Sequence, residues 1–154
     1  MVDTRSKDQR SRIMAAVHSK NTGPELLVRK FLWSHSVRYR IHVANLPGKP
    51  DIVIPRCKLA IFVHGCFWHG HENCSLGRLP KSRVEYWKEK IEKNKLRDRQ
   101  VEGKLETEGW QCLVVWHCQL RTKKAASIFL PELLKEIKNH RIHSASKTVD
   151  ILKG

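Results

Sequence analysis

Two short apolar runs separated by one long helical pattern constrain the fold of this chain more than any other feature of its sequence. The runs are residues 59–63 (LAIFV) and 111–116 (QCLVVW), and both have the nearly continuous apolar character of buried strands. Between them, residues 83–108 are highly charged and have the pattern of a long helix. Its inward stripe recurs at alternating steps of three and four and consists of Val84, Trp87, Ile91, Asn94, Asp98, Val101 and Leu105. A crossover of this length connects parallel strands, so the sequence predicts an α/β fold with a mixed central sheet flanked by helices.

Helix and strand signals on either side of this unit supply the other elements. Residues 3–17 indicate a basic first helix with an apolar tip. Thr22-Gly23-Pro24-Glu25 has the signature of a second helix start, with proline near the first helical position and an acid in the first turn. That helix is expected to end around His35. The remaining predicted elements are strands at residues 38–43 and 51–54 and a last helix around residues 125–140.

The charge of the chain indicates a polyanionic partner. Thirty Lys and Arg residues stand against fifteen Asp and Glu residues, a formal charge of +15, and the basic residues are spread along the whole length. Nucleic acid is the natural partner of such a protein, while a ribosome-associated protein or a merely basic surface would carry the same charge. The sequence has neither a long apolar run nor a signal peptide, so we expect a cytoplasmic protein that does not enter a membrane.

Cysteine and histidine gather in one segment with the spacing of metal ligands. Cys66-x4-His71-x2-Cys74 supplies three such side chains within nine residues, and zinc binds four N or S donors in a tetrahedron. Cys118 is the expected fourth ligand because it follows the end of a strand predicted to lie parallel to the one before Cys66. Cys112 lies inside an apolar strand and is expected to pack in the core. The closed shell predicts a structural zinc; the alternative is ordinary buried thiols and solvated histidines.

The same segment contains His64, His69, Phe67 and Trp68, which this zinc does not need. His64 ends a buried strand, where a lone histidine is more often structural than catalytic. Asp98 lies on the inward stripe of the long helix, and a carboxylate that faces an apolar layer needs a partner, so we expect Asp98 to pair with His64. Phe67 and Trp68 would be core residues in most proteins, and in a chain this basic they are equally candidate wedges for a base stack.

Asp51 is the candidate acid of a catalytic site. It follows the turn at residues 47–50 and opens a short strand, where an aspartate is usually a turn residue. Glu25 lies on an early helix, and a second strand ends at Val63. With Asp51, these elements follow one another in an order that resembles a restriction-endonuclease-like core. In that core an aspartate and the second strand hold Mg²⁺ against a scissile phosphate.

Five blocks of the chain occur in the order and with the spacing of one known family. They are RSRIM at 10–14, LPGKPD at 46–51, IFVHGCFWHGH at 61–71, EYWKEKIEKNKLRD at 85–98 and GWQCLVVWHC at 109–118. On these blocks, which span roughly residues 1 to 120, the chain resembles the very short patch repair (Vsr) endonucleases, bacterial enzymes that nick DNA at T:G mismatches. One spacing departs from the family: His71 and Cys74 are one residue further apart than expected.

The resemblance implies the catalytic roles. Asp51 would ligate Mg²⁺ together with the backbone carbonyl of Val63, and Glu25 would bind the water shell of the metal. His69 would be the general base that activates water. The other implied catalytic residues are His64 and Asp98, which as a pair would assist at the phosphate.

The resemblance also implies the DNA contacts and the zinc site. Phe67, Trp68 and Trp87 match an aromatic wedge that enters the DNA beside the mismatch, Met14 would reach the minor groove, and Asn94 is counted among the DNA-binding residues. The implied zinc ligands are Cys66, His71, Cys74 and Cys118, the same set that the strand ends predict. Contact with the mismatch-repair protein MutL is a further expectation of the family, and we expect a monomer.

These interpretations together predict three segments and one activity. Residues 1–20 are expected to form a basic N-terminal arm, residues 21–140 a restriction-endonuclease-like catalytic domain with the zinc site, and residues 141–154 a polar tail. The expected activity is a Mg²⁺-dependent nick 5′ to the T of a T:G mismatch that arises by deamination of 5-methylcytosine. Two alternatives stay open: a restriction-type nuclease that cuts matched DNA, and a non-catalytic zinc-stabilised DNA-binding module.

Overall fold

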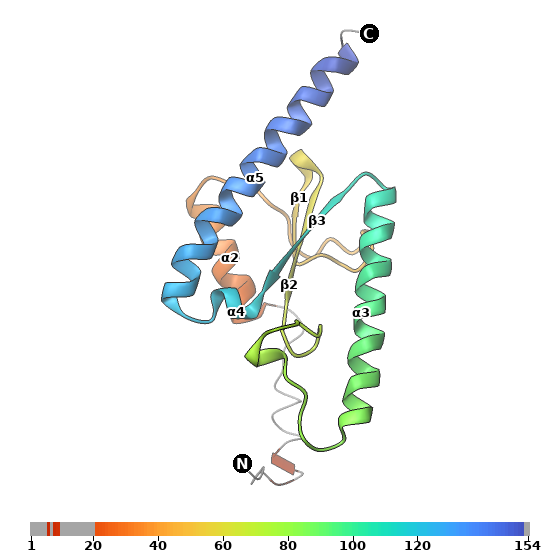
Figure 1. Cartoon of the computed structure of the whole chain (residues 1–154). Helices are drawn as coiled ribbons and strands as arrows, with labels where there is room; N and C mark the ends of the chain where they lie inside the picture. Colours follow the sequence, from red (N-terminus) through yellow and green to blue (C-terminus); the bar gives the residue numbers. More distant parts are fainter. Residues whose placement is uncertain (1–5, 7, 10–20, 153–154) are drawn as a thin grey trace.

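The structure is a computed structural model that describes residues 6, 8, 9 and 21–152, with side chains described through residue 140 (Figure 1). Most of the predicted N-terminal arm, including Met14, lies outside the described residues.

A mixed three-stranded sheet with the order β1-β2-β3 forms the centre of the described structure. Strand β1 (Ile52–Ile54) is antiparallel to β2 (Leu59–His64), and β2 is parallel to β3 (Gln111–Trp116). The predicted central strand and its parallel partner are therefore confirmed. In the β2–β3 register His64 lies opposite Trp116, so the segments that follow the two strands leave the sheet at the same edge.

The predicted strand at residues 38–43 is wrong. This segment forms only one isolated bridge, in which Arg40 is hydrogen-bonded to Val53 on the edge strand. His42 adopts a left-handed backbone conformation, with φ of 55°, which interrupts an extended strand. The alternating sequence therefore makes a loop that touches the sheet at a single point.

Two predicted helices begin and end close to their expected limits. Helix α2 covers Gly23–Ser34; the Thr22 hydroxyl accepts a hydrogen bond from the Glu25 N–H at 3.4 Å, and His35 caps the C-terminal end. Helix α3 covers Val84–Thr107. Its inward stripe includes the buried Ile91 and Leu105, whereas Val84, predicted to belong to the stripe, is exposed at the first turn.

The C-terminal helix is longer than predicted. After the short helix α4 (His117–Leu120), helix α5 covers Lys123–Leu152. Residues 141–152, which the sequence suggested to be a polar tail, continue this helix, and Figure 1 shows the end of α5 projecting away from the sheet.

Helices cover both faces of the sheet (Figure 1). On one face, α2 and α5 pack through residues such as Leu32 and Ile137 against Ile61 of the central strand. On the other face, Leu105 of α3 packs against Ala60. Cys112 is half-buried against this second cluster, as predicted. The two layers hold the ends of β2 and β3 in fixed positions.

Within the described part of the chain, no helix combines the length and the apolar character needed to cross a bilayer.

Candidate functional site

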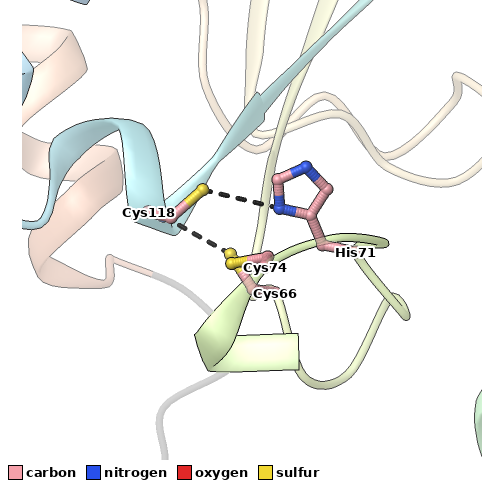
Figure 2. Close-up of side chains that lie close together, drawn as sticks. All are labelled: Cys66, His71, Cys74 and Cys118. Atoms are coloured by element: carbon pink, nitrogen blue, oxygen red, sulfur yellow. Dashed lines mark hydrogen bonds between the residues drawn. The ribbon is translucent and has the colours of Figure 1, made fainter. Parts of the chain in front are cut away.

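A cluster of three thiols and one imidazole forms where β2 and β3 end. Cys66 follows β2 and Cys118 follows β3, while His71 and Cys74 come from the loop between β2 and α3. One ligand atom from each of the four residues lies within 4.8 Å of all the others, and Figure 2 shows them pointing toward one another. Cys118 Sγ is 3.5 Å from His71 Nδ1, and the Cys118 N–H donates to Cys66 Sγ at 3.4 Å. Cys118, and not Cys112, lies in this cluster.

The loop is shaped to keep His71 and Cys74 in this cluster. The His71 ring stacks on Trp116 with centroids 4.1 Å apart and planes inclined by 4°. The His71 N–H donates to the Cys66 carbonyl at 2.9 Å. Asn73 turns the chain with a left-handed φ of 54°, and a Cβ at Gly77 would clash with the His71 carbonyl. This turn lies between His71 and Cys74.

The electrostatics of the cluster suit a cation. The pKa of the Cys118 thiol is raised to about 12, mainly by burial and in part by the neighbouring Cys66 and Cys74 thiols. Three thiolates this close would repel one another unless a positive ion lay between them. A metal ion removes that repulsion and deprotonates its coordinating thiols. The donor set of three sulfurs and one imidazole nitrogen is typical of structural zinc.

A second cluster, of His64, His69 and Asp98, lies at the same sheet edge. The His69 N–H donates to the Gly65 carbonyl at 3.2 Å, so the chain turns back after β2. This turn lays the His69 ring parallel to the His64 ring, with centroids 3.7 Å apart. His69 Nδ1 is then 2.7 Å from Asp98 Oδ2.

The expected pairing of Asp98 with His64 is therefore corrected: the hydrogen bond of Asp98 is to His69. A carboxylate accepts, so Nδ1 carries the proton and Nε2 keeps a lone pair, the arrangement of a histidine general base oriented by an acid. The pKa of His64 is lowered to about 4, mainly by burial and in part by the neighbouring His69, while Asp98 partly opposes the shift. His64 is neutral at pH 7.

Asp51 is held at the start of β1 by a tight loop. Gly48 has φ of +70° and sits so close to α3 that a Cβ there would clash with Val101. The Val63 N–H donates to Asp51 Oδ2 at 2.7 Å. In an extended strand the N–H and C=O of one residue point to the same side, so the Val63 carbonyl faces the side of Asp51 as well.

Asp51 is a half-buried acid whose neighbours only partly offset the effect of burial on its charge. Its pKa is raised to about 6, mainly by burial and in part by the charge of Glu25, while the hydrogen bond from Val63 and the charge of Arg29 act in the opposite direction. A cation beside the carboxylate would restore the ionised form. Oxygen ligands of this kind are what Mg²⁺ prefers.

One open cavity of about 1330 Å³ brings the predicted catalytic residues together. It is lined by Glu25, Asp51, Val63, His64, His69 and Asp98. The basic residues Lys49, Arg97 and Arg99 also line it and were not predicted, although the last two lie beside Asp98 on α3. Such a cavity, with acids inside and cations around them, is suited to a phosphodiester with a metal ion.

An aromatic cluster lies next to this cavity. Ring centroids of Phe67, Trp68 and Trp87 are 5.1 to 6.0 Å apart, and all three side chains are half-buried. Asn94 Nδ2 donates to the Trp68 carbonyl at 2.8 Å, so this amide ties the loop to α3. The sequence reasoning missed Tyr86, which is 45% exposed with its ring 5.1 Å from Trp87.

The chain matches the family model described as DNA mismatch endonuclease Vsr over residues 2–75. It is 49% identical over 134 residues to the type II nicking enzyme V.XorIIP of Xanthomonas oryzae pv. oryzae, covering 87% of this chain and 98% of that protein. It is 45% identical over 139 residues to the type II nicking enzyme V.NmeAIP of Neisseria meningitidis, covering 90% and 99%. It is 40% identical over 137 residues to the DNA mismatch endonuclease Vsr of Escherichia coli, covering 88% and 87%.

Proposed function

The chain belongs to the Vsr family of DNA mismatch endonucleases, and on this premise we propose that it nicks one DNA strand 5′ to the T of a T:G mismatch. The observation that carries the proposal is the meeting of the half-buried Asp51, a His–Asp pair and an aromatic cluster around one cavity. The mixed sheet, with these residues at one edge, supports a restriction-endonuclease-like core.

Asp51 and the Val63 carbonyl would hold Mg²⁺ in this site. The chemistry that Mg²⁺ supplies when bound is stabilisation of the charge on the pentacoordinate phosphate. The fit rests on Asp51, a half-buried carboxylate whose pKa is raised mainly by burial, so that a neighbouring cation would favour its ionised form. Glu25 lines the same cavity and would hold water of the metal's hydration shell.

His69 would act as the general base. Its Nδ1 proton is held by Asp98, so its Nε2 can take a proton from the attacking water, and the carboxylate stabilises the imidazolium that forms. His64, neutral and stacked on His69, would donate a hydrogen bond to a phosphate oxygen. The basic rim of the cavity would hold the flanking phosphates.

The aromatic cluster would recognise the mismatch. A T:G wobble pair is weakly stacked, so inserting rings beside it requires less free energy than beside a matched pair. Phe67, Trp68 and Trp87 form one group of rings on the loop after β2 and the first turns of α3. Met14, in the arm at residues 1–20, and Asn94 complete the proposed DNA-binding residues.

Cys66, His71, Cys74 and Cys118 would bind one structural zinc ion. The ion would fix the loop that carries both His69 and the aromatic cluster, so it would support activity without taking part in the reaction. Duplex DNA with a T:G mismatch is the proposed substrate. Contact with MutL, a monomeric state and action in the bacterial cytoplasm are further parts of the proposal, drawn from the family.

A nicking assay on paired duplexes tests the function. The duplexes carry a T:G, a T:A or a C:G pair within randomised flanking bases, because the residues described do not specify the flanks, and each strand is labelled separately. With Mg²⁺ we expect a nick 5′ to the T of the T:G duplex alone, and none from the Asp51→Asn variant. Equal cutting of matched duplexes would favour a restriction-type nuclease. Binding without cutting would favour a DNA-binding module.

A further inference from the structure

Arg29 is a buried cation one helical turn after Glu25 on α2, and none of the roles above uses it. Only 8% of Arg29 and 3% of Glu25 is exposed. Arg29 Nη2 donates to Glu25 Oε2 at 3.2 Å, and Arg29 Nη1 donates to Asn21 Oδ1 at 2.8 Å. The Asn21 N–H donates in turn to Glu25 Oε2 at 2.9 Å. The three residues form a closed ring of hydrogen bonds at the start of α2.

Stability of the fold does not explain an arginine at this position. Val28 and Leu32, on either side of it in α2, are core residues with no exposed surface. Arg29 Nε is buried and has no hydrogen-bond partner among the described residues, which is unfavourable for a charged group. A buried ion pair often stabilises a protein no more than apolar residues of the same volume. An apolar side chain would therefore serve the core at least as well.

The ring leaves one side of the Glu25 carboxylate available. Both hydrogen bonds that Glu25 accepts go to Oε2, and no described residue is hydrogen-bonded to Oε1. Glu25 lines the cavity that also contains Asp51, whereas Arg29 does not line it. The guanidinium thus holds the carboxylate from behind, directly through Nη2 and indirectly through Nη1, which binds the Asn21 side chain while the Asn21 N–H donates to Glu25.

We propose that Arg29 is a positioning residue for the metal site, which fixes Glu25 so that Oε1 is free to bind the water shell of the divalent cation. This inference rests on the proposed function, because it requires the cation beside Asp51. This positioning acts through Glu25, so it disappears when the Glu25 carboxylate is removed. Residues that orient metal-site groups in this way typically change metal affinity or activity by roughly 10- to 100-fold.

Binding of Mn²⁺, followed by electron paramagnetic resonance of the free ion, tests this role without measuring nicking. The protein is first loaded with one equivalent of zinc, since Mn²⁺ prefers oxygen ligands and leaves the thiol cluster to zinc. The variants are Arg29→Met, Arg29→Lys, Glu25→Gln and the Glu25→Gln/Arg29→Met double variant. Lys30→Met is the matched control, because Lys30 is an exposed cation on the same helix.

We expect Arg29→Met to bind Mn²⁺ roughly 10- to 100-fold more weakly than the wild type, with an unfolding temperature that is unchanged or higher. The double variant should bind as Glu25→Gln does, Arg29→Lys should lose part of the affinity because it lacks the planar fork, and Lys30→Met should match the wild type.

Wild-type affinity in Arg29→Met, tighter binding, or an equal loss in the Glu25→Gln background would overturn the proposed role. If Arg29→Met does not fold, Arg29→Lys decides the question by the same comparison. A wild-type protein that binds no Mn²⁺ would refute the metal site itself, and with it this role, before any variant is compared.

Discussion

Replacement of Asp51 by asparagine removes the carboxylate charge from the candidate metal site and preserves the shape of the side chain. The amide oxygen of asparagine can still accept the hydrogen bond from the Val63 N–H, which is 2.7 Å from Asp51 Oδ2. In the folded protein, burial raises the pKa of Asp51 from 3.8 to about 6. A difference of two units corresponds to about 3 kcal/mol by which the folded state disfavours the ionised acid.

The pH dependence follows from the direction of this shift. Below pH 4 the acid is protonated in both the folded and the unfolded states, so it does not affect the free energy of unfolding. As the pH rises from about 4 to about 6, the unfolded state loses its proton first and the wild type loses stability. Above pH 6 the loss is complete. Asp51→Asn should therefore stabilise the protein by up to about 3 kcal/mol at pH 8 and by little at pH 4.

Urea unfolding of both proteins between pH 4 and pH 8, with zinc present and Mg²⁺ absent, measures this difference. Asp8→Asn is the control, because Asp8 is an exposed acid for which no change is expected. Addition of Mg²⁺ at pH 8 should stabilise the wild type and not Asp51→Asn, since a ligand stabilises only the state that binds it. The reasoning would be refuted by an Asp51→Asn protein that is less stable at pH 8, or by a difference that does not change with pH.

Three further outcomes test the remaining parts of the site. The purified protein should contain one equivalent of zinc, and Cys118→Ala should lower both the zinc content and the unfolding temperature. Cys112→Ala should retain the zinc, because Cys112 packs against the α3 side of the sheet. His69→Gln and Asp98→Asn should each reduce the nicking rate at least about 100-fold with DNA affinity unchanged, as expected for a base and its orienting acid; a wild-type rate in either variant would exclude that role. Trp68→Ala should weaken binding to T:G duplex by roughly five- to a hundred-fold at fixed salt, with a smaller effect on matched duplex, and an equal effect on both would make Trp68 a structural residue.

The sequence alone predicted two kinds of feature. One kind follows from the local periodicity of a helix, and the other follows from the parallel arrangement of the two strands in a strand–helix–strand unit. The stripe of α3 placed Asn94 and Asp98 on the inward face, and both side chains contact the loop after β2 in the structure. The parallel pairing of β2 with β3 placed Cys118 beside Cys66. Each of these predictions depends on backbone geometry that repeats regularly, so a pattern in the sequence is enough to establish it.

The strand predicted at residues 38–43 is absent because an alternating pattern is compatible with a strand but is not sufficient to form one. The segment makes only the bridge between Arg40 and Val53, and His42 leaves the extended region of the backbone. Whether an alternating segment extends a sheet depends on the length of the neighbouring edge strand. Here that strand, β1, is only three residues long.

Tertiary structure decided which side chains are partners within the site. Asp98 pairs with His69 and not with His64, because the turn after Gly65 lays one imidazole on the other. The ring of hydrogen bonds around Arg29 likewise depends on the packing of α2 against the sheet. Sequence spacing specifies the element and the face on which a residue lies. The partner of a buried charge is set by irregular turns and by the packing of distant segments, and neither leaves a periodic pattern in the sequence.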